Sequence, residues 1–545
     1  MSAHEHTDTN GGQTTMARQP SVGSGVHLTF GPDPATSMVV SWLADGEPAA
    51  RGAASAPAGA LSALRQGLRP QRPAVRFAPA GPDSVPLDPV PDDDTAERAD
   101  ATTSTFRDAA RRRHHVHHAR LGGLRPGTRY RYTIEPAPSE APATGEFRTA
   151  AAPGDPGEAF TFTCFGDHGT DEPDDPYGTA ASRAVVGALD RYDPLFHLVI
   201  GDLTYASLRQ DPARAWADWF RMIAPSARHR PWMPVAGNHE SERGMGRFGL
   251  TPYQAYFASP PNGAGPDYEG LWYAFTVGRA RFVMLFGEDV CYQDHGEVYL
   301  YGFSEGRQTA WLERTLREAR ADGAIDWVIV GVHQVAMSTA AYHNGGDLGL
   351  RAAWLPLFDR YQVDLVLCGH EHHYERTHPV RGVVPDSTEL TPLPALTTEP
   401  AVLSTAPRAT ARPVVGSLTA RPAGAELERI DATTGAVHVT IGTGGSSTPS
   451  SEALFDPPAG RVVVEAEKRH GAGRRRTVYR LEAAPWLAAR STEHPYAFAA
   501  LRVDPGEPGG TTTIRVTVHD SLAPDEPPFD DFMLTRPRPG EAGSA

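Results

Sequence analysis

The sequence predicts an all-β sandwich followed by a layered α/β domain. Short runs of β-forming residues between Pro- and Gly-rich connections occupy residues 25–150. From residue 158 onward, apolar strands alternate with amphipathic helical segments, and this order builds an α/β domain. Several of these strands end in clusters of polar residues, and strand carboxyl ends are where α/β sheets place their sites. The chain's 545 residues suffice for two or more domains with sizeable cores.

The N-terminal part is expected to be a sandwich like the fibronectin type III architecture, because short β-forming runs follow one another without helical spacing. Its strands are predicted at VHLTF, SMVVSWL, AVRFA, STFRDA, HHVHHARL, RYRYTIEP and GEFRTA. The run Arg111–His118 contains four histidines. Neighbouring side chains of a strand point to opposite faces, so we interpret this run as a polar strand and not as a metal site. Residues 1–24 are polar and are expected to be disordered.

The α/β domain is predicted to span residues 158–535, with its polar loops at the strand ends. Its first strands are predicted at FTFTCFGD, LFHLVIGD, WMPVAGNHE, ARFVMLFG, WVIVGVHQ and VDLVLCGH, and its helices at ASRAVVGALDRY, DPARAWADWFRMI, EGRQTAWLERTLREARADG and LGLRAAWLPLFDRY. Two inserts are expected, one near 382–428, which is rich in Pro, Thr and Ala, and one near 450–494, which carries a basic cluster. The strands at the C-terminus are expected to complete the sheet of the same domain.

Composition narrows the classes of function. The formal net charge of −15 argues against general nucleic-acid binding, which favours basic surfaces. It leaves room for a small anionic substrate, because metal ions can reverse the local field. Three cysteines provide no disulfide framework. Cys164 and Cys368 end apolar runs and are expected to be small buried residues.

The N-terminus and the hydropathy pattern predict a protein that stays off the membrane. The first residues lack the charged and apolar regions of a signal peptide. No apolar run approaches the ~20 residues that a bilayer-spanning helix needs. The sequence as given therefore predicts a cytoplasmic protein.

Five short segments place metal-binding side chains directly after apolar runs. They are Phe165–Gly169, Gly201–Tyr205, Gly237–Glu240, Val330–His333 and Gly369–His372. A strand that ends in Gly-Asp presents its carboxylate in a fixed direction, and both Asp167 and Asp202 arise in this way. Asp202 and Tyr205 are three residues apart in a turn, so both can bind one ion. A carboxylate with a phenolate is a hard oxygen set that favours ferric iron.

The other segments supply neutral ligands. His370 and His372 are two residues apart after a buried strand, so they can face one side and serve neighbouring ions. Asn238 and His333 add an amide and a third imidazole. Asn is a weak ligand that suits a divalent ion, because such an ion must exchange substrate. The sequence therefore predicts two metal ions side by side.

The five segments resemble the motif series GDxG, GDxxY, GNH(D/E), VxxH and GHxH of the purple acid phosphatases, within the calcineurin-like metallophosphoesterases. The run GHEHHYERTHPV and the SMVVSW strand continue the match, which covers most of residues 25–535 outside the inserts. The resemblance implies a fibronectin-like sandwich followed by a four-layer αββα domain. It also implies a secreted location as the alternative to a cytoplasmic one.

The resemblance also implies a role for each site residue. Fe³⁺ would be held by Asp167, Tyr205 and His372, and a divalent ion (Fe²⁺, Zn²⁺ or Mn²⁺) by Asn238, His333 and His370, with Asp202 bridging the two. His239 would lie near the substrate phosphate, and His343 would contact the substrate. Tyr342 stands where plant relatives carry another histidine, and NGGDLG replaces the acidic stretch that follows there.

The implied activity is hydrolysis of the monoester of a small phosphorylated substrate, with a metal-bound hydroxide attacking phosphorus in line. A phosphodiesterase or nucleotide pyrophosphatase on the same scaffold is the alternative that the motifs leave open. A non-catalytic protein that binds through its sandwich is a third hypothesis. It predicts erosion of the metal ligands, yet all seven positions hold residues that can bind a metal.

Overall fold

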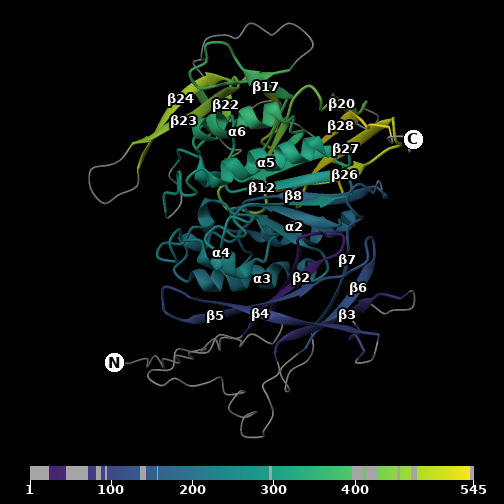
Figure 1. Ribbon diagram of the computed structural model, residues 1–545. Helices are drawn as coiled ribbons and strands as arrows, with labels where there is room; N and C mark the ends of the chain where they lie inside the picture. The colour runs from purple at the N-terminus through teal and green to yellow at the C-terminus, as the bar shows by residue number, and fades with distance from the viewer. Residues whose placement is uncertain are drawn as a thin grey trace, which may run out of the picture.

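The computed structural model describes residues 24–44, 72–81, 88–91, 95–135, 143–155, 157–293, 298–395, 410–412, 426–450, 454–467 and 475–540. Of the predicted disordered segment 1–24, residues 1–23 lie outside the described residues, and Ser24 begins a strand; residues 468–474, which hold most of the basic cluster, also lie outside them. The described chain forms an all-β layer that packs against a larger α/β part (Figure 1). The predicted fold class is confirmed.

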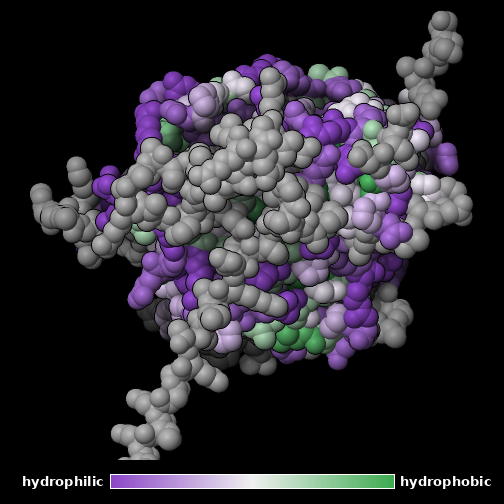
Figure 2. Space-filling model, turned by 90° about the horizontal axis from the view of Figure 1, so that it is seen from below, coloured by the Kyte–Doolittle hydropathy of each residue, from purple (hydrophilic) through white to green (hydrophobic). Residues whose placement is uncertain are grey.

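The N-terminal part is the expected β-sandwich. Its strands are β1 (Ser24–Phe30), β2 (Met38–Ala44), β3 (Ala74–Pro79), β4 (Glu97–Arg107), β5 (Arg113–Leu121), β6 (Arg129–Ile134) and β7 (Ala143–Arg148), in the spatial order β1-β2-β5-β4-β3-β6-β7. The long strand β4 pairs with β3 through its first residues and with β5 through its last, so it joins the two halves. The coloured part of the face seen from below in Figure 2 is mostly hydrophilic, with a small hydrophobic area near one edge.

The histidine-rich strand β5 helps to attach the sandwich to the α/β part. His118 Nε2 lies 3.0 Å from the carbonyl oxygen of Ala255, and His27 Nε2 on β1 lies 3.0 Å from that of Tyr256. The Tyr132 hydroxyl donates to the carbonyl of Arg228 at 2.8 Å. These buried polar contacts fix the sandwich against the ends of two helices, so the histidines are structural residues.

Two seven-stranded sheets form the centre of the α/β part. The first has the order β10-β9-β8-β26-β27-β28-β20 and the second the order β11-β12-β13-β15-β21-β16-β25. The strands of the first are β8 (Phe160–Phe165), β9 (Phe196–Ile200), β10 (Trp232–Val235), β20 (Glu428–Asp431), β26 (Ala497–Asp504), β27 (Thr511–Asp520) and β28 (Asp530–Pro537). Those of the second are β11 (Tyr273–Val277), β12 (Ala280–Leu285), β13 (Trp327–Val332), β15 (Leu365–Cys368), β16 (Tyr374–Thr377), β21 (Val437–Ile441) and β25 (Leu487–Ser491).

The two sheets face each other across a dry aromatic core. Phe162 of β8 stacks on Phe196 of β9 with ring centroids 5.3 Å apart. Phe282 of β12 meets both rings edge-on, at 5.1 and 5.2 Å. Edge-to-face contacts of this kind stabilise a core beyond the area they bury. They also fix the spacing of the sheets, and with it the distance between the loops at their ends.

Helices cover the outer faces of both sheets and complete four layers (Figure 1). They are α2 (Ala180–Leu189), α3 (Pro212–Ala227), α4 (Thr251–Tyr256), α5 (Arg307–Ala321) and α6 (Leu348–Arg360). The predicted proline at the start of α3 is Pro212, whose missing N–H costs nothing in the first turn. Thr179, Asp211 and Asp347 cap α2, α3 and α6 through their side-chain oxygens. Among the described helices, none has both the length and the apolar character needed to cross a bilayer.

The expected insert near 450–494 contains ordered strands. Its main feature is a hairpin of β23 (Ala459–Glu467) and β24 (Arg476–Ala483), to which the two-residue strand β14 (Gly346–Asp347) adds a third strand. Two small pairs, β17 (Val380–Val383) with β18 (Pro392–Pro394) and β19 (Thr410–Arg412) with β22 (Leu454–Asp456), lie in the two inserts. Charged residues such as Arg461, Glu465 and Arg480 interrupt β23 and β24, so neither strand has a long continuous apolar run.

A buried ion pair ties this hairpin to α6. The Arg351 guanidinium donates to both carboxylate oxygens of Glu482, at 2.6 and 2.9 Å, and the two side chains are 0% and 3% exposed. Its other N–H groups donate to the carbonyls of Ala336 and Glu389. Removal of either partner would leave a buried charge without compensation.

We predict that Arg351→Met lowers the free energy of unfolding by about 3–5 kcal/mol, because Glu482 loses its partner. Arg360→Met is the matched control on the same helix. Its ion pair with Glu313 is exposed, at 61% and 40%, so its removal should cost at most about 1 kcal/mol. Urea unfolding of both variants measures the difference. Equal stability of Arg351→Met and the wild type would contradict the role given to this pair.

Candidate metal centre

The five polar segments predicted from the sequence converge at one edge of the two sheets. β8, β9 and β10 are parallel and end before Asp167, Asp202 and Asn238. β13 and β15 are parallel in the facing sheet and end before His333 and His370. The carboxyl ends of parallel strands lie side by side, so residues that are far apart in sequence meet at the seam between the sheets.

The first group of donor atoms contains Asp167, Tyr205 and His372. The Tyr205 hydroxyl lies 3.5 Å from Asp167 Oδ1 and 3.2 Å from His372 Nε2. His372 Nε2 lies 3.2 Å from Asp167 Oδ1. All three side chains are buried. Two of the three donors are oxygens, as expected for a hard cation.

The second group contains Asn238, His333 and His370. His370 Nδ1 lies 3.0 Å from Asn238 Oδ1 and 3.3 Å from His333 Nε2. Asp202 adjoins this group, because its Oδ2 lies 3.2 Å from His333 Nε2. Ligand atoms of Asp202, His333 and His370 lie within 4.8 Å of one another, a spacing that can hold one ion.

The hydrogen-bond partners of the histidines show that this donor set fits a cation. His333 Nδ1 is 2.7 Å from the carbonyl oxygen of Ile200, and His372 Nδ1 is 2.8 Å from that of Thr448. Each Nδ1 therefore donates its proton to a carbonyl oxygen, and each Nε2 faces a carboxylate, where it can hold a proton or a metal ion. Lone pairs in such contact repel each other unless a positive charge lies between them.

The electrostatic field of the site agrees with this interpretation. Burial lowers the pKa of His333, but the Asp202 and Asp167 carboxylates outweigh burial and raise it to about 10. Burial also lowers the pKa of His372, but the Asp167 carboxylate outweighs burial and raises it. Burial and the same carboxylates raise the pKa of the Tyr205 phenol far above its usual value. A pocket that attracts protons this strongly also attracts metal ions.

Backbone strain is concentrated in the same loops. Asp167, Asp202, Tyr205 and His370 have φ values of 58°, 51°, 52° and 67°. This left-handed region is unfavourable for residues other than glycine, and such strain is retained where the surrounding structure requires it. Here it turns each side chain into the seam immediately after a strand ends.

The glycines of these motifs leave room for a ligand from a neighbouring strand. A Cβ on Gly237 would lie 2.3 Å from Asp202 Oδ1, and a Cβ on Gly369 would lie 2.7 Å from Asp167 Oδ2. The structure adds close approach as a reason for glycine at these positions.

His239 and His343, the predicted substrate contacts, lie beside different residues of the donor cluster. His239 Nε2 is 3.9 Å from Asp202 Oδ2, and its ring lies 5.0 Å from that of Tyr205. The ring of His343 lies 5.0 Å from that of His370 and 5.2 Å from that of His372. Tyr342 beside it is 77% exposed.

Four residues around the centre had no predicted role. Glu240 accepts N–H groups from Gly237, Asp202 and Leu203 at 2.7–2.9 Å and so joins two ligand loops. The Asn344 amide contacts His370 Nε2, Glu371 contacts His343, and Thr448 holds His372. Glu240 and Glu371 lie inside the motifs GNHE and GHEH, where charged residues next to ligands were the available signal.

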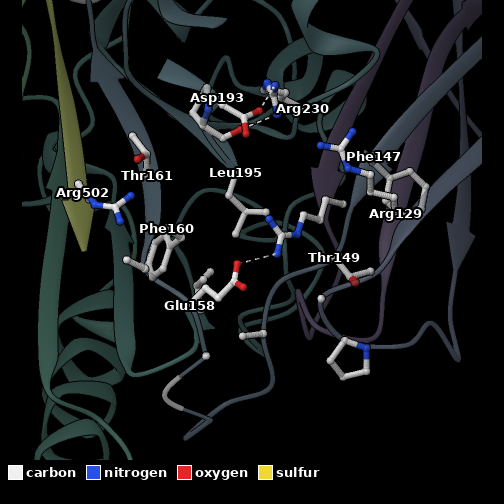
Figure 3. A pocket seen from close by; sticks show the side chains of 18 of the residues that line it. Arg129, Phe147, Thr149, Glu158, Phe160, Thr161, Asp193, Leu195, Arg230 and Arg502 are labelled. Atoms are coloured by element: carbon white, nitrogen blue, oxygen red, sulfur yellow. Dashed lines mark hydrogen bonds and ion pairs between the residues drawn. The ribbon is translucent and has the colours of Figure 1, made fainter. Parts of the chain in front are cut away.

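A separate cleft of about 770 Å³ lies between the sandwich and the α/β part (Figure 3). No predicted site residue lines it. Its four arginines are matched by four carboxylates, among which Asp193 pairs with Arg230 at 2.7 Å and Glu158 with Arg148 at 3.9 Å. This balance of charge offers no preference for an anionic substrate, so the chemistry is assigned to the seam.

Comparison with known proteins agrees with this geometry. Residues 160–374 match the model of the calcineurin-like phosphoesterases, and residues 24–149 match that of the N-terminal domain of purple acid phosphatases. An uncharacterized protein of Mycobacterium tuberculosis is 40% identical over 537 residues, which cover 96% of this chain and 88% of that protein. Acid phosphatase type 7 of Homo sapiens is 30% identical over 332 residues, or 57% of this chain and 66% of that protein.

A solved structure shares the fold. The purple acid phosphatase PPD1 from yellow lupin seeds superposes with a TM-score of 0.61 and 19% sequence identity. The match covers 94% of this chain and 74% of that one. It therefore extends over both the sandwich and the four-layer part.

We predict that Gly237→Ala lowers metal affinity at least about tenfold, because the new Cβ would displace the Asp202 carboxylate. The φ of Gly237 is −101°, which alanine also adopts, so the expected loss comes only from the contact between the new Cβ and Asp202. Gly187→Ala in α2 is the control, since a Cβ there meets no atom within 4 Å. Metal content by mass spectrometry after dialysis measures the effect. Full metal content in Gly237→Ala would show that the close approach is unimportant.

Proposed function

The chain belongs to the purple acid phosphatase family of calcineurin-like phosphoesterases and is a phosphatase, and from this premise we propose that it hydrolyses phosphate monoesters with a ferric–divalent metal centre. The observation that carries the proposal is the pair of adjacent donor groups at the seam, one of which contains a tyrosine hydroxyl. Oxygen donors favour a trivalent ion, and imidazole and amide donors favour an exchangeable divalent one.

We propose the following ligands. Asp167, Tyr205 and His372 would hold Fe³⁺, Asn238, His333 and His370 would hold Fe²⁺, Zn²⁺ or Mn²⁺, and Asp202 would be shared between the two ions. The contact distances within each group support this division. Two carboxylates and one phenolate against five positive charges leave about two positive charges, which suits a phosphate dianion. When bound, the ions would polarise the phosphoryl oxygens and lower the pKa of coordinated water toward about 7.

The remaining residues would orient the substrate and supply protons. His239 and His343 flank the donor cluster, so a phosphate held there would meet an imidazole on either side. We assign to them the stabilisation of phosphate charge and the protonation of the leaving alkoxide. The Ser207 hydroxyl, 3.1 Å from His239 Nδ1, would orient that ring.

The sandwich contributes none of the proposed ligands. We propose that residues 25–150 form this structural domain and residues 158–535 the catalytic domain, with inserts near 382–428 and 450–494. The contacts of His27, His118 and Tyr132 support a role for the sandwich in holding the helices of the catalytic domain.

A direct assay separates monoester from diester hydrolysis. The purified protein is analysed for metals, and p-nitrophenyl phosphate and bis-p-nitrophenyl phosphate are offered at equal concentration. We expect iron with one divalent metal and a higher kcat/KM for the monoester. A higher kcat/KM for the diester would favour the phosphodiesterase or nucleotide pyrophosphatase alternative.

We predict that Asp202→Asn removes at least one metal and nearly all activity, because two nearby cations would lose the carboxylate between them. Asp193→Asn is the control, since Asp193 also has a left-handed backbone, with φ 43°, but its side chain is 76% exposed, pairs with Arg230 and lies before β9, whereas Asp202 lies after that strand. Metal analysis and p-nitrophenyl phosphate turnover measure both variants. An Asp202→Asn protein with two metals and near wild-type turnover would contradict the dinuclear proposal.

We predict that the oxidised protein is purple to pink and that Tyr205→Phe bleaches it. A phenolate bound to ferric iron absorbs visible light by charge transfer, whereas carboxylate, amide and imidazole ligands lack a donor orbital of suitable energy. Tyr177→Phe is the control, because Tyr177 stacks on Tyr205 at 5.9 Å and is no ligand. Visible spectra are recorded together with iron content. Wild-type protein that contains ferric iron and stays colourless would refute phenolate ligation.

A further inference from the structure

Glu371, the central residue of the His370–His372 turn, engages the loop that carries His343. Its side chain is fully buried. One carboxylate oxygen accepts the N–H of Gly345 at 2.6 Å, and the other lies 3.2 Å from Nδ1 of His343. A buried carboxylate is costly unless its oxygens are satisfied. The Gly345 N–H satisfies one oxygen, and the ion-pair contact with His343 compensates the charge at the other, which accepts no hydrogen bond of good geometry from the described residues.

The contact fixes the orientation of the His343 imidazole. The ring lies against the rings of His370 and His372, at 5.0 and 5.2 Å, and its side chain is 34% exposed. Because Nδ1 is turned toward Glu371, Nε2 is the nitrogen on the far side of the ring. His343 therefore offers Nε2 to a group held beside the two metal-binding histidines.

Other contacts hold the backbone of the same loop. Arg461 donates to the carbonyl of Ala341 at 2.7 Å and lies 3.6 Å over the ring of Tyr479. β14 pairs with β23 immediately after Asn344. The hairpin thus places the loop, while Glu371 acts on the imidazole. The two functions can be separated by mutation.

We propose that Glu371 is a positioning residue that aims Nε2 of His343 at the leaving-group oxygen. The proposal rests on the proposed phosphatase function. When the phosphorus–oxygen bond of the ester breaks, its electron pair stays on the alkoxide oxygen, which takes the Nε2 proton, and His343 regains a proton from solvent. Glu371 remains ionised throughout and only orients the ring, as carboxylates that orient catalytic histidines do.

The test compares two esters in the metal-loaded full-length protein. Glu371→Gln keeps the size of the side chain and an acceptor for Gly345, but it places an amide beside Nδ1. We expect kcat for glycerol 2-phosphate to fall about 10–100-fold with little change in KM, because an alkoxide needs a proton to leave. We expect less than about a threefold fall for p-nitrophenyl phosphate, whose leaving group needs little protonation, and an unchanged metal content.

Glu375→Gln is the matched control. Glu375 is also buried and also pairs with a histidine at 3.2 Å, but that partner is His373, which is not a proposed ligand or substrate contact. We expect its kcat values for both esters to stay within about threefold of the wild type. Equal losses in the two variants would overturn the proposal, because they would show that any buried Glu–His pair in this segment matters equally.

A double-variant cycle supplies a second criterion. If Glu371 acts only through His343, Glu371→Gln should add less than about threefold to the loss caused by His343→Ala on glycerol 2-phosphate. Losses that multiply would overturn the proposal.

A crystal structure of Glu371→Gln should show the His343 ring rotated or displaced, and an unmoved ring would also overturn it. If Glu371→Gln fails to fold, Glu371→Asp, which keeps the charge but shortens the reach, is held to the same criteria.

The outcomes distinguish this proposal from the proposed function. A fully metallated wild type that hydrolyses neither ester would refute the phosphatase function itself. Wild-type turnover together with equal losses on the two esters, or with loss of metal from Glu371→Gln, would refute only the role of Glu371. Metal loss would show that the carboxylate shapes the turn of His370 and His372 and does not aim His343.

Discussion

Groups that repel one another are held together at the seam between the two sheets. Nε2 of His333 and Nε2 of His372 each lie 3.2 Å from a carboxylate oxygen, inside a buried pocket where charges are least screened, and without a cation their lone pairs would repel those oxygens. This arrangement has a conformational cost, because four residues of the donor loops adopt a left-handed backbone that is unfavourable for residues other than glycine. A proton or a metal ion at Nε2 removes this repulsion, so the affinity of the site for metal would be linked to the stability of the loops.

The neighbouring layers keep that arrangement from relaxing. The carbonyls of Ile200 and Thr448 fix two histidine tautomers, and Glu240 joins two ligand loops through backbone N–H groups. The aromatic contacts between the sheets set their separation. Each sheet carries part of the ligand set, so a change in the separation of the sheets would pull the two donor groups apart. The distance between the two donor groups therefore depends on aromatic packing between the sheets, away from the donor groups themselves.

The sequence predicted the parts of this structure that depend on local pattern. Strands that end in Gly-Asp located Asp167 and Asp202, and the 3.6-residue period located α2, α3, α5 and α6. The order of the four layers came from the resemblance to a family and not from periodicity. The pattern could not show contacts closed by distant segments, such as Glu371 with His343 or Arg351 with Glu482. The β23–β24 hairpin was missed because its contacts with distant segments and its pairing with β14 leave no mark in the local pattern.

The place of β26 in the first sheet has a consequence for biosynthesis. β8, which leads into Asp167, pairs on one side with β9 and on the other with β26, which is encoded near the end of the chain. While the ribosome is still translating the middle of the protein, β8 has an unpaired apolar edge, and such edges invite aggregation. The sheet closes only after the last strands emerge, and contacts of such long sequence separation form slowly. The strand that presents Asp167 is therefore paired on both sides only after β26 has been synthesised, and we expect its open edge to need protection until then.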